Sequence, residues 1–205
     1  MSDIRNAIEN ALSAMAPLID SAVVSTSTVA ASTVLTTATA HGLVSGLYVT
    51  LAGHTSTPTI NGVYKITVIS TTKFSIPTAV TVAGSGGTVT ANLYAWENVE
   101  FAPVSGIPYQ TGTLVRAKPD NPEMGASFRD RGFFQVDCVF PSQRGTSTAE
   151  ARAELIRTTF KRGTTLSSGS VTLMVLETPH ILPGYSAPGV FIVPVRIPYE
   201  AQITV

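Results

Sequence analysis

The chain combines two different compositions. Residues 21–94 contain no Asp, Glu or Arg, and their only formally charged residues are Lys65 and Lys73. The same stretch is rich in Thr, Val, Ser and Gly, a composition typical of short strands joined by tight turns. We therefore predict a small all-β domain, a sandwich or a barrel, over residues 21–94. It interrupts a discontinuous domain made of residues 1–20 and 95–205, which holds nearly all the other charged residues.

The overall composition fits two small domains. With 205 residues and 44% hydrophobic content, the chain has enough apolar residues for two cores. Its formal net charge of +0 argues against a protein that relies on bulk attraction to phosphate, because nonspecific nucleic-acid binding usually leaves a basic excess. The single cysteine, Cys138, excludes an intramolecular disulfide. Because Val136 and Val139 flank it, we predict that Cys138 is a half-buried strand residue.

The N-terminal segment does not have the pattern of a secretory signal peptide. Asp3, Arg5 and Glu9 interrupt its apolar residues, whereas a signal peptide needs an unbroken apolar region. No run in the chain approaches the roughly 18 apolar residues of a membrane-spanning helix. The sequence therefore predicts no membrane association and a cytoplasmic default location.

The first segment of the discontinuous domain is a predicted helix. Ile4, Ile8 and Leu12 recur at helical spacing after a possible cap at Ser2 or Asp3, and Pro17 kinks or ends the helix. A single apolar stripe implies that the helix packs on a sheet formed later in the chain.

Short β-branched runs separated by turn residues predict the strands of the inserted domain. Asn61-Gly62 is the clearest turn signal. Residues 21–32 are either a first strand or part of a hinge. The predicted strands are 33–37, 47–51, 63–70, 73–76 and 87–93.

Six elements are predicted in the chain after the insert. Strands are predicted around Val99–Phe101 and Leu114–Arg116, and over 133–140, where alternation places Phe134, Val136, Cys138 and Phe140 on one face. A capping box of Ser147 and Glu150 opens a second helix that stops before Gly163. Two more strands follow, over 171–176 and 190–197.

Prolines affect the last of these strands. Pro194 and Pro198 lack an N–H for a strand ladder, so the pattern predicts an edge strand or a bulged strand. The resulting fold class is α+β, with two helices packed on a mostly antiparallel sheet and the all-β domain inserted after the first helix.

The residues point to no catalytic chemistry. His41 and His54 lie in a segment without carboxylates, and His180 stands between Pro179 and Ile181, so neither a metal site nor a catalytic triad is indicated. Ser85 lies in a Gly-rich turn that lacks the lysine and the strand-to-helix setting of a phosphate loop. We predict no catalytic residue, no metal ligand and no cofactor.

The densest charged stretch runs from Lys118 to Arg131 and predicts a long loop. Long ordered loops often bind partners, and Met124 and Phe128 would supply apolar anchors. The alternative is a solvated loop whose opposite charges pair locally. The candidate residues for a subunit interface are Lys118, Asp120, Glu123, Met124, Phe128, Arg129, Asp130 and Arg131.

Three further basic residues are candidates for a surface that faces a lumen or DNA: Arg144, Lys161 and Arg162. The alternative is that they are ordinary solvated charges, since Lys161 and Arg162 suit the C-terminal end of a helix.

One set of short motifs lies outside the insert: Trp96-Glu97-Asn98, Pro108-Tyr109, Arg131-Gly132, Phe134-Gln135-Val136, residues 153–156 and 160–164, Pro183-Gly184-Tyr185, and residues 194–199. Through these motifs, the sequence without the insert resembles the tail terminator, or tail completion, family of tailed bacteriophages. A second set lies in the insert: His41-Gly42-Leu43, Gly46, Val49, Gly53, Asn61-Gly62-Val63-Tyr64 and Phe74. Through this second set, the insert resembles small immunoglobulin-like β modules found in phage structural proteins.

This resemblance implies a structural, non-enzymatic virion protein. Such proteins form a hexameric ring at the head-proximal end of the tail tube, stop tube polymerisation and present a surface to the head connector. The implied partners are other copies of the chain, the tail tube protein, the head–tail connector protein and passing genomic DNA, without sequence specificity. Assembly would take place in the host cytoplasm.

Two alternatives remain open from the sequence. One is a head–tail connector or another minor tail protein. The other is a cell-surface or glycan-binding module carried by the insert, for which Tyr48, Tyr64 and Tyr94 would have to form a stacking surface.

Overall fold

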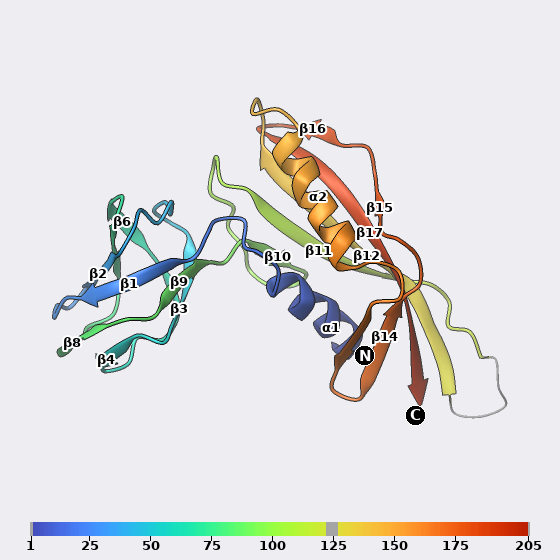
Figure 1. Ribbon diagram of the computed structural model, residues 1–205, viewed down its shortest axis with the longest axis horizontal. Helices are drawn as coiled ribbons and strands as arrows, with labels where there is room; N and C mark the ends of the chain where they lie inside the picture. Colours follow the sequence, from blue (N-terminus) through green and yellow to red (C-terminus); the bar gives the residue numbers. More distant parts are fainter. Residues whose placement is uncertain (1, 122–126, 205) are drawn as a thin grey trace. The chain divides into compact units, whose positions relative to one another are not determined.

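The computed structural model describes residues 2–121 and 127–204, and the chain folds into two compact units (Figure 1). Unit 1 combines the N-terminal residues up to Met15 with the chain from Tyr94 onward, and unit 2 spans Ala16–Leu93. The composition changes close to both of these boundaries.

The predicted α+β class is wrong. The chain is mostly β, with 48% strand and 12% helix, and its strands form one nearly closed, barrel-like sheet and one half-barrel. The prediction gave too much weight to the two helical patterns, because it assigned to loops several segments that are strands. Residues 127–132, for example, extend a strand that was expected to begin at Phe133.

Unit 2 contains nine strands in an antiparallel sheet of order β5-β3-β9-β1-β2-β7-β6, with β4 and β8 paired beside β1. The edge strands β5 and β6 are separated along the chain by Ile66 alone, so the sheet nearly closes on itself. The strands are β1 (Ala22–Ser27), β2 (Thr33–Thr37), β3 (Tyr48–Ala52), β4 (Thr55–Thr57), β5 (Gly62–Lys65), β6 (Thr67–Ser70), β7 (Lys73–Ile76), β8 (Val82–Ser85) and β9 (Thr88–Ala91).

Alternating side chains fill the interior of unit 2. Leu35, Val49, Phe74 and Val89 are almost completely buried, as expected for strands with one face on a core. The Asn61-Gly62 signal does not make a hairpin turn between Ile60 and Val63. Asn61 instead uses its side-chain amide to accept from the His54 N–H at 2.8 Å and to donate to the His54 carbonyl at 3.0 Å, while Gly62 begins β5.

Unit 1 contains two helices and eight strands among its described residues. The sheet order is β10-β11-β12-β17-β14-β13, with β15 and β16 also paired to β17, and every pairing except the parallel β10–β11 pair is antiparallel. The elements are α1 (Ser2–Ser13), β10 (Tyr94–Trp96), β11 (Tyr109–Arg116), β12 (Ser127–Pro141), α2 (Ser147–Thr159), β13 (Thr165–Ser168), β14 (Val171–Val175), β15 (His180–Ile181), β16 (Tyr185–Ala187) and β17 (Val190–Thr204).

One hydrophobic core holds unit 1 together. Ile4, Ile8 and Leu12 of α1 and Ile156 of α2 are buried in the same cluster as side chains from β12, β14 and β17. The predicted shared face of β12 is confirmed, since Phe134, Val136 and Cys138 are buried and Phe140 packs against them. Figure 1 shows α2 lying along the sheet near β12 and β17.

The predicted strand at Val99–Phe101 does not form. The segment between β10 and β11 is irregular, and Asn98 adopts a positive φ of 62° that ends the short strand β10. The capping box is also wrong: α2 begins at Ser147 itself, so the N-cap residue is Thr146, which makes no side-chain capping bond.

The prediction of an edge or bulged last strand is wrong too. β17 is a central strand, paired with β12 over its whole length and with β14, β15 and β16 on its other side. The carbonyls of Pro194 and Pro198 accept from the N–H groups of Leu182 and Leu176, on the side of the short strands. In an antiparallel strand, the N–H and C=O of one residue point to the same side. The two prolines therefore lack an N–H only on the side of β17 where its partners are the short, interrupted strands.

Candidate assembly surfaces

The face of the unit 1 sheet opposite its helices is partly exposed and rich in polar side chains. We call it the open face. Residues on β12 and β17 alternate between the buried core and this face, and cross-strand partners share it. The open face consists of Thr111, Thr113, Val115, Arg129, Arg131, Phe133, Gln135, Asp137, Arg196, Pro198, Glu200 and Gln202.

Most charged side chains on the open face make polar contacts with other side chains of the same face. Arg131 donates from Nε to Oε2 of Glu200 at 2.5 Å. Arg196 donates to Oε1 of Gln135 at 3.1 Å, and its guanidinium lies 4.8 Å from the centre of the Phe133 ring. Gln135 in turn donates to Oδ1 of Asp137 at 2.9 Å. These contacts order the side chains, although each exposed pair contributes little to stability.

The charged stretch from Lys118 to Arg131 is only partly the loop that was predicted. Phe128, Arg129, Asp130 and Arg131 lie in β12, whereas Glu123 and Met124 lie outside the described residues. Lys118 and Asp120 are exposed. Asp120 is joined to Arg129 by two backbone hydrogen bonds of 3.0 and 2.8 Å, which hold this segment against β12.

Strand alternation separates the candidate interface residues of β12. Arg129 and Arg131 lie on the open face, while Phe128 and Asp130 point to the opposite side. Asp130 is only 4% exposed. Its carboxylate accepts from the Tyr199 hydroxyl at 3.3 Å and lies 3.9 Å from Nη1 of Arg116. Asp130 therefore acts inside the subunit.

The surroundings of Tyr199 disfavour ionisation of its hydroxyl. Its ring is fully buried beside the Asp130 carboxylate. Burial first, and then the negative charge of Asp130, raise the pKa of the Tyr199 hydroxyl, so this phenol stays protonated and remains a donor to Asp130.

The three basic candidates for a lumen or DNA surface do not form one cluster. All are exposed, but Arg144 precedes α2, whereas Lys161 and Arg162 follow it. A helix of 13 residues is about 20 Å long, so these charges flank α2 at opposite ends.

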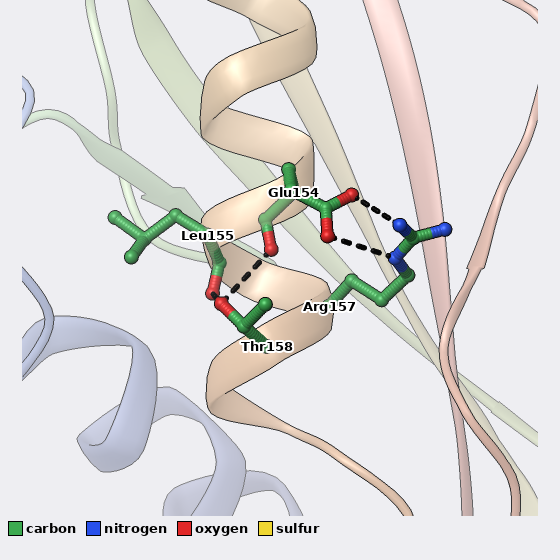
Figure 2. A network of polar contacts seen from close by, with 4 residues as sticks. All are labelled: Glu154, Leu155, Arg157 and Thr158. Carbon is green, nitrogen blue, oxygen red and sulfur yellow. Dashed lines mark hydrogen bonds and ion pairs between the residues drawn. The ribbon is translucent and has the colours of Figure 1, made fainter.

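The solvent-facing side of α2 carries a self-contained polar network (Figure 2). Arg157 contacts both carboxylate oxygens of Glu154, at 3.2 Å from Nε and 2.6 Å from Nη2. The Thr158 hydroxyl donates to the Glu154 and Leu155 carbonyls, each at 3.0 Å. This pair is matched within one turn of helix and exposed, so it contributes little to stability.

A buried arginine is the main polar feature that the sequence reasoning missed. Arg152 is 6% exposed and donates to Oε1 of Gln110 at 3.1 Å from Nε and 2.7 Å from Nη2. Its Nη2 also lies 3.1 Å from the Tyr94 hydroxyl. The signal was present, because Arg152 follows Ala149 by three residues and precedes Ile156 by four, which places it on the buried face of α2.

The histidines of unit 2 serve its packing. His54 is buried, its Nδ1 donates to the Gly86 carbonyl at 2.7 Å, and its Nε2 accepts from the Ser27 hydroxyl at 3.0 Å. This resembles a catalytic serine–histidine pair, but Ser27 is only 3% exposed and its oxygen accepts from the Gly84 N–H at 2.9 Å. The pair therefore joins three strand ends rather than meeting a substrate.

Of the other two histidines, one is buried and one is exposed. His41 is buried, and its Nδ1 accepts from the Leu43 N–H at 3.0 Å. His180 is exposed on β15. Over residues 2–121 and 127–204, no three His, Cys, Asp or Glu side chains are grouped as metal ligands would be.

The tyrosines required for a glycan-stacking surface do not share one. Tyr48 pairs with Lys65 and Tyr64 with Val49, so alternation sends the two rings to opposite faces of the same pair of strands. Tyr94 belongs to unit 1, where its ring stacks on Trp96 at 4.9 Å between centroids.

Comparison with known families decides the identity of the chain. The model of a family described as phage tail terminator protein matches residues 76–199, which is more than half of the sequence. The chain belongs to the phage tail terminator family. The predicted family is thereby confirmed, while the immunoglobulin-like character of the insert stays a prediction.

Membership in the terminator family makes this chain a structural component of the phage tail that interacts with other tail or head proteins. The match begins at the end of β7 and runs to Tyr199, so it includes β12 and most of β17, which carry most of the open face.

Other comparisons add little to the terminator assignment. A solved chain whose name describes no function is 23% identical, with a TM-score of 0.45, and the match covers 55% of this chain and 80% of that one. A similarity of this size supports no inference. Curated proteins give no significant match. Within the described residues, no helix is long and apolar enough to cross a membrane.

Proposed function

We propose that this chain caps the head-proximal end of the phage tail tube as a ring of six copies. The ring stops polymerisation of the tube protein and presents its other side to the head connector. The observation that carries the proposal is the match of the terminator family over residues 76–199. Assembly in the host cytoplasm and a final position between tube and head follow from the same proposal.

A ring needs two different surfaces on each subunit, because each copy contacts one neighbour on each side. The open face and its margin supply candidates for one of them. Arg129 and Arg131 lie on that face, and Lys118 and Asp120 lie exposed beside β12. Glu123 and Met124 belong to the same proposed interface. Asp130 instead supports the strand from inside the subunit, and Phe128, which is half-buried, lies on the same side of β12.

Passing DNA is the remaining proposed contact, and it needs no sequence-specific site. Arg144, Lys161 and Arg162 are exposed cations that can attract phosphate.

Unit 2 is proposed to be a decoration domain that ring formation does not require. Residues 16–93 contain few charges, and the candidate interface residues all lie in unit 1.

The proposal is tested by polymerising purified tail tube protein with increasing amounts of this chain. We expect shorter tubes with one end capped, because a bound ring blocks further addition. A tube length distribution that does not respond to the chain would contradict the proposal. Binding to connector rings without any effect on tubes would instead favour the head–tail connector alternative.

A further inference from the structure

The two points where unit 1 is interrupted by unit 2 are joined by a direct hydrogen bond. The chain leaves unit 1 after Met15 and returns at Tyr94. The Tyr94 hydroxyl donates to the carbonyl of Leu12, in the last turn of α1, at 2.7 Å. The same carbonyl also accepts from the Met15 N–H at 3.2 Å, so Tyr94 adds a second bond to the end of the helix.

Arg152 fixes the position of the Tyr94 hydroxyl. Its Nη2 lies 3.1 Å from that oxygen and 2.7 Å from Oε1 of Gln110, which is itself 1% exposed. Gln110 in turn donates from Nε2 to the Cys138 sulfur at 3.5 Å. One buried network thus joins the end of α1 to β10, β11, β12 and α2.

One further contact acts on Tyr94 within β10, and another joins α1 to the chain just after β10. The Tyr94 ring stacks on Trp96 with an interplanar angle of 9°, which restrains the phenol in the plane required for its hydrogen bond. On the surface, Arg5 of α1 pairs with Glu97, just after β10. This pair is exposed, so screening makes it the weaker of the two ties between α1 and the returning chain.

Loss of this network would first weaken the docking of α1 in unit 1. The helix is separated from the rest of unit 1 by the 78 residues of Ala16–Leu93 and has 12 residues of its own. A helix of this length is marginal without tertiary contacts. Its docking therefore depends on its buried apolar residues and on what anchors its C-terminal end.

We propose that Tyr94 and Arg152 form a clamp at the root of unit 2. The clamp keeps the two chain crossings together, so that α1 stays docked in unit 1 when unit 2 unfolds locally or bears load. Unit 2 then behaves as a module carried by a closed unit 1, and not as a linker on which α1 depends.

The test is hydrogen exchange measured by mass spectrometry on full-length variants. Y94F removes the hydroxyl and keeps the ring, while R152M removes the guanidinium and keeps an unbranched apolar chain. R157M is the matched control on the same helix, because Arg157 is exposed and pairs with Glu154 at the surface (Figure 2). One lost hydrogen bond corresponds to about a threefold to tenfold change in an opening equilibrium.

For Y94F we expect residues 10–15 to exchange about threefold to tenfold faster, with the strands of unit 2 unchanged. R152M should give at least the same effect, and R157M none. The proposal is overturned if Y94F leaves the exchange of α1 unchanged, or if it accelerates exchange equally throughout unit 1. Y94F decides the question even if R152M does not fold, because a tyrosine-to-phenylalanine change preserves packing.

Discussion

Arg131 and Glu200 form an ion pair across β12 and β17, with Nε of Arg131 2.5 Å from Oε2 of Glu200, on the sheet face that the helices leave uncovered. The Arg131 side chain is 43% exposed. An exposed pair of this kind adds little to the free energy of folding, yet it orders two charged groups at a surface. The pair therefore fits recognition of a partner better than stabilisation of the subunit.

Reversing the charges of the proposed interface should weaken association without unfolding the subunit. For R129E/R131E we expect about a tenfold loss in the affinity between copies, because like charges then meet at the contact, and a change in unfolding free energy of about 1 kcal/mol or less. Light scattering over a range of concentrations and a denaturant titration measure the two effects.

The swapped variant R131E/E200R is the control for the reversal. It restores an opposite-charge pair within the strand ladder, so a defect that persists there reports the contact with another copy. If R129E/R131E assembles as well as the parent protein, these side chains are merely solvated.

Asp130 should matter for stability and not for assembly. D130N removes the charge that faces Arg116 and weakens the acceptor for Tyr199, while the side chain remains buried. We expect the unfolding free energy to fall by about 1–3 kcal/mol. Urea denaturation measures this loss, and Y199F, which removes the donor on the other side of the same bond, should cost about 1 kcal/mol. Unchanged stability in D130N would mean that the buried contacts are not significant.

Cys138 should make the protein sensitive to alkaline pH. Burial raises the pKa of its thiol from 9.0 to about 12, although the hydrogen bond from Gln110 opposes the shift. The folded-state value lies above the unfolded one, so the stabilising contribution is complete below pH 9 and is lost as the pH rises toward 12. Within that window, the unfolding free energy should fall by about 1.4 kcal/mol per pH unit because of this group.

The comparison of parent and C138A by urea denaturation between pH 8 and pH 10.5, under reducing conditions, isolates this contribution. C138A should show a shallower decline than the parent chain above pH 9. Parallel declines would show that the thiol ionises equally well in both states.

Removal of unit 2 should leave unit 1 folded. We expect a chain in which a short Gly-Ser linker joins Met15 to Tyr94 to unfold in one cooperative transition, because the core of unit 1 contains no residue from 16–93. It should still form rings. The matched variant that also lacks Tyr94 should be less stable, since it loses the bond to Leu12. Calorimetry and light scattering test both statements, and loss of rings in the first variant would contradict the decoration proposal.

Some of this fold was readable from local patterns. The helix at residues 2–13 follows from Ile4, Ile8 and Leu12, and the buried face of β12 follows from strict alternation around Val136. Each of these patterns lies within one continuous segment, so that segment alone is enough to predict the helix or the buried strand face. The family was recognisable for a related reason, since its motifs lie in continuous segments of unit 1.

The errors came from features that depend on partners far away in the sequence. Whether a proline is tolerated in β17 depends on which side of the strand has interrupted partners, and the strand itself does not contain that information. The fold class was wrong because several strand segments were assigned to loops by composition. Arg129 and Arg131 are examples, since pairing with Gln202 and Glu200 makes them strand residues. Arg152 was missed for another reason: its position on the buried face was readable, but a charge usually indicates solvent.

The central claim is that this chain caps tail tubes as a ring, and the direct measurement is its state with and without tubes. Light scattering on a size-exclusion column gives the mass of the purified chain, and negative-stain images of the same peak mixed with tail tubes show where it binds. We predict a six-fold ring at one end of each tube, whether or not rings also form in solution. A monomer that leaves tube ends bare would contradict the account.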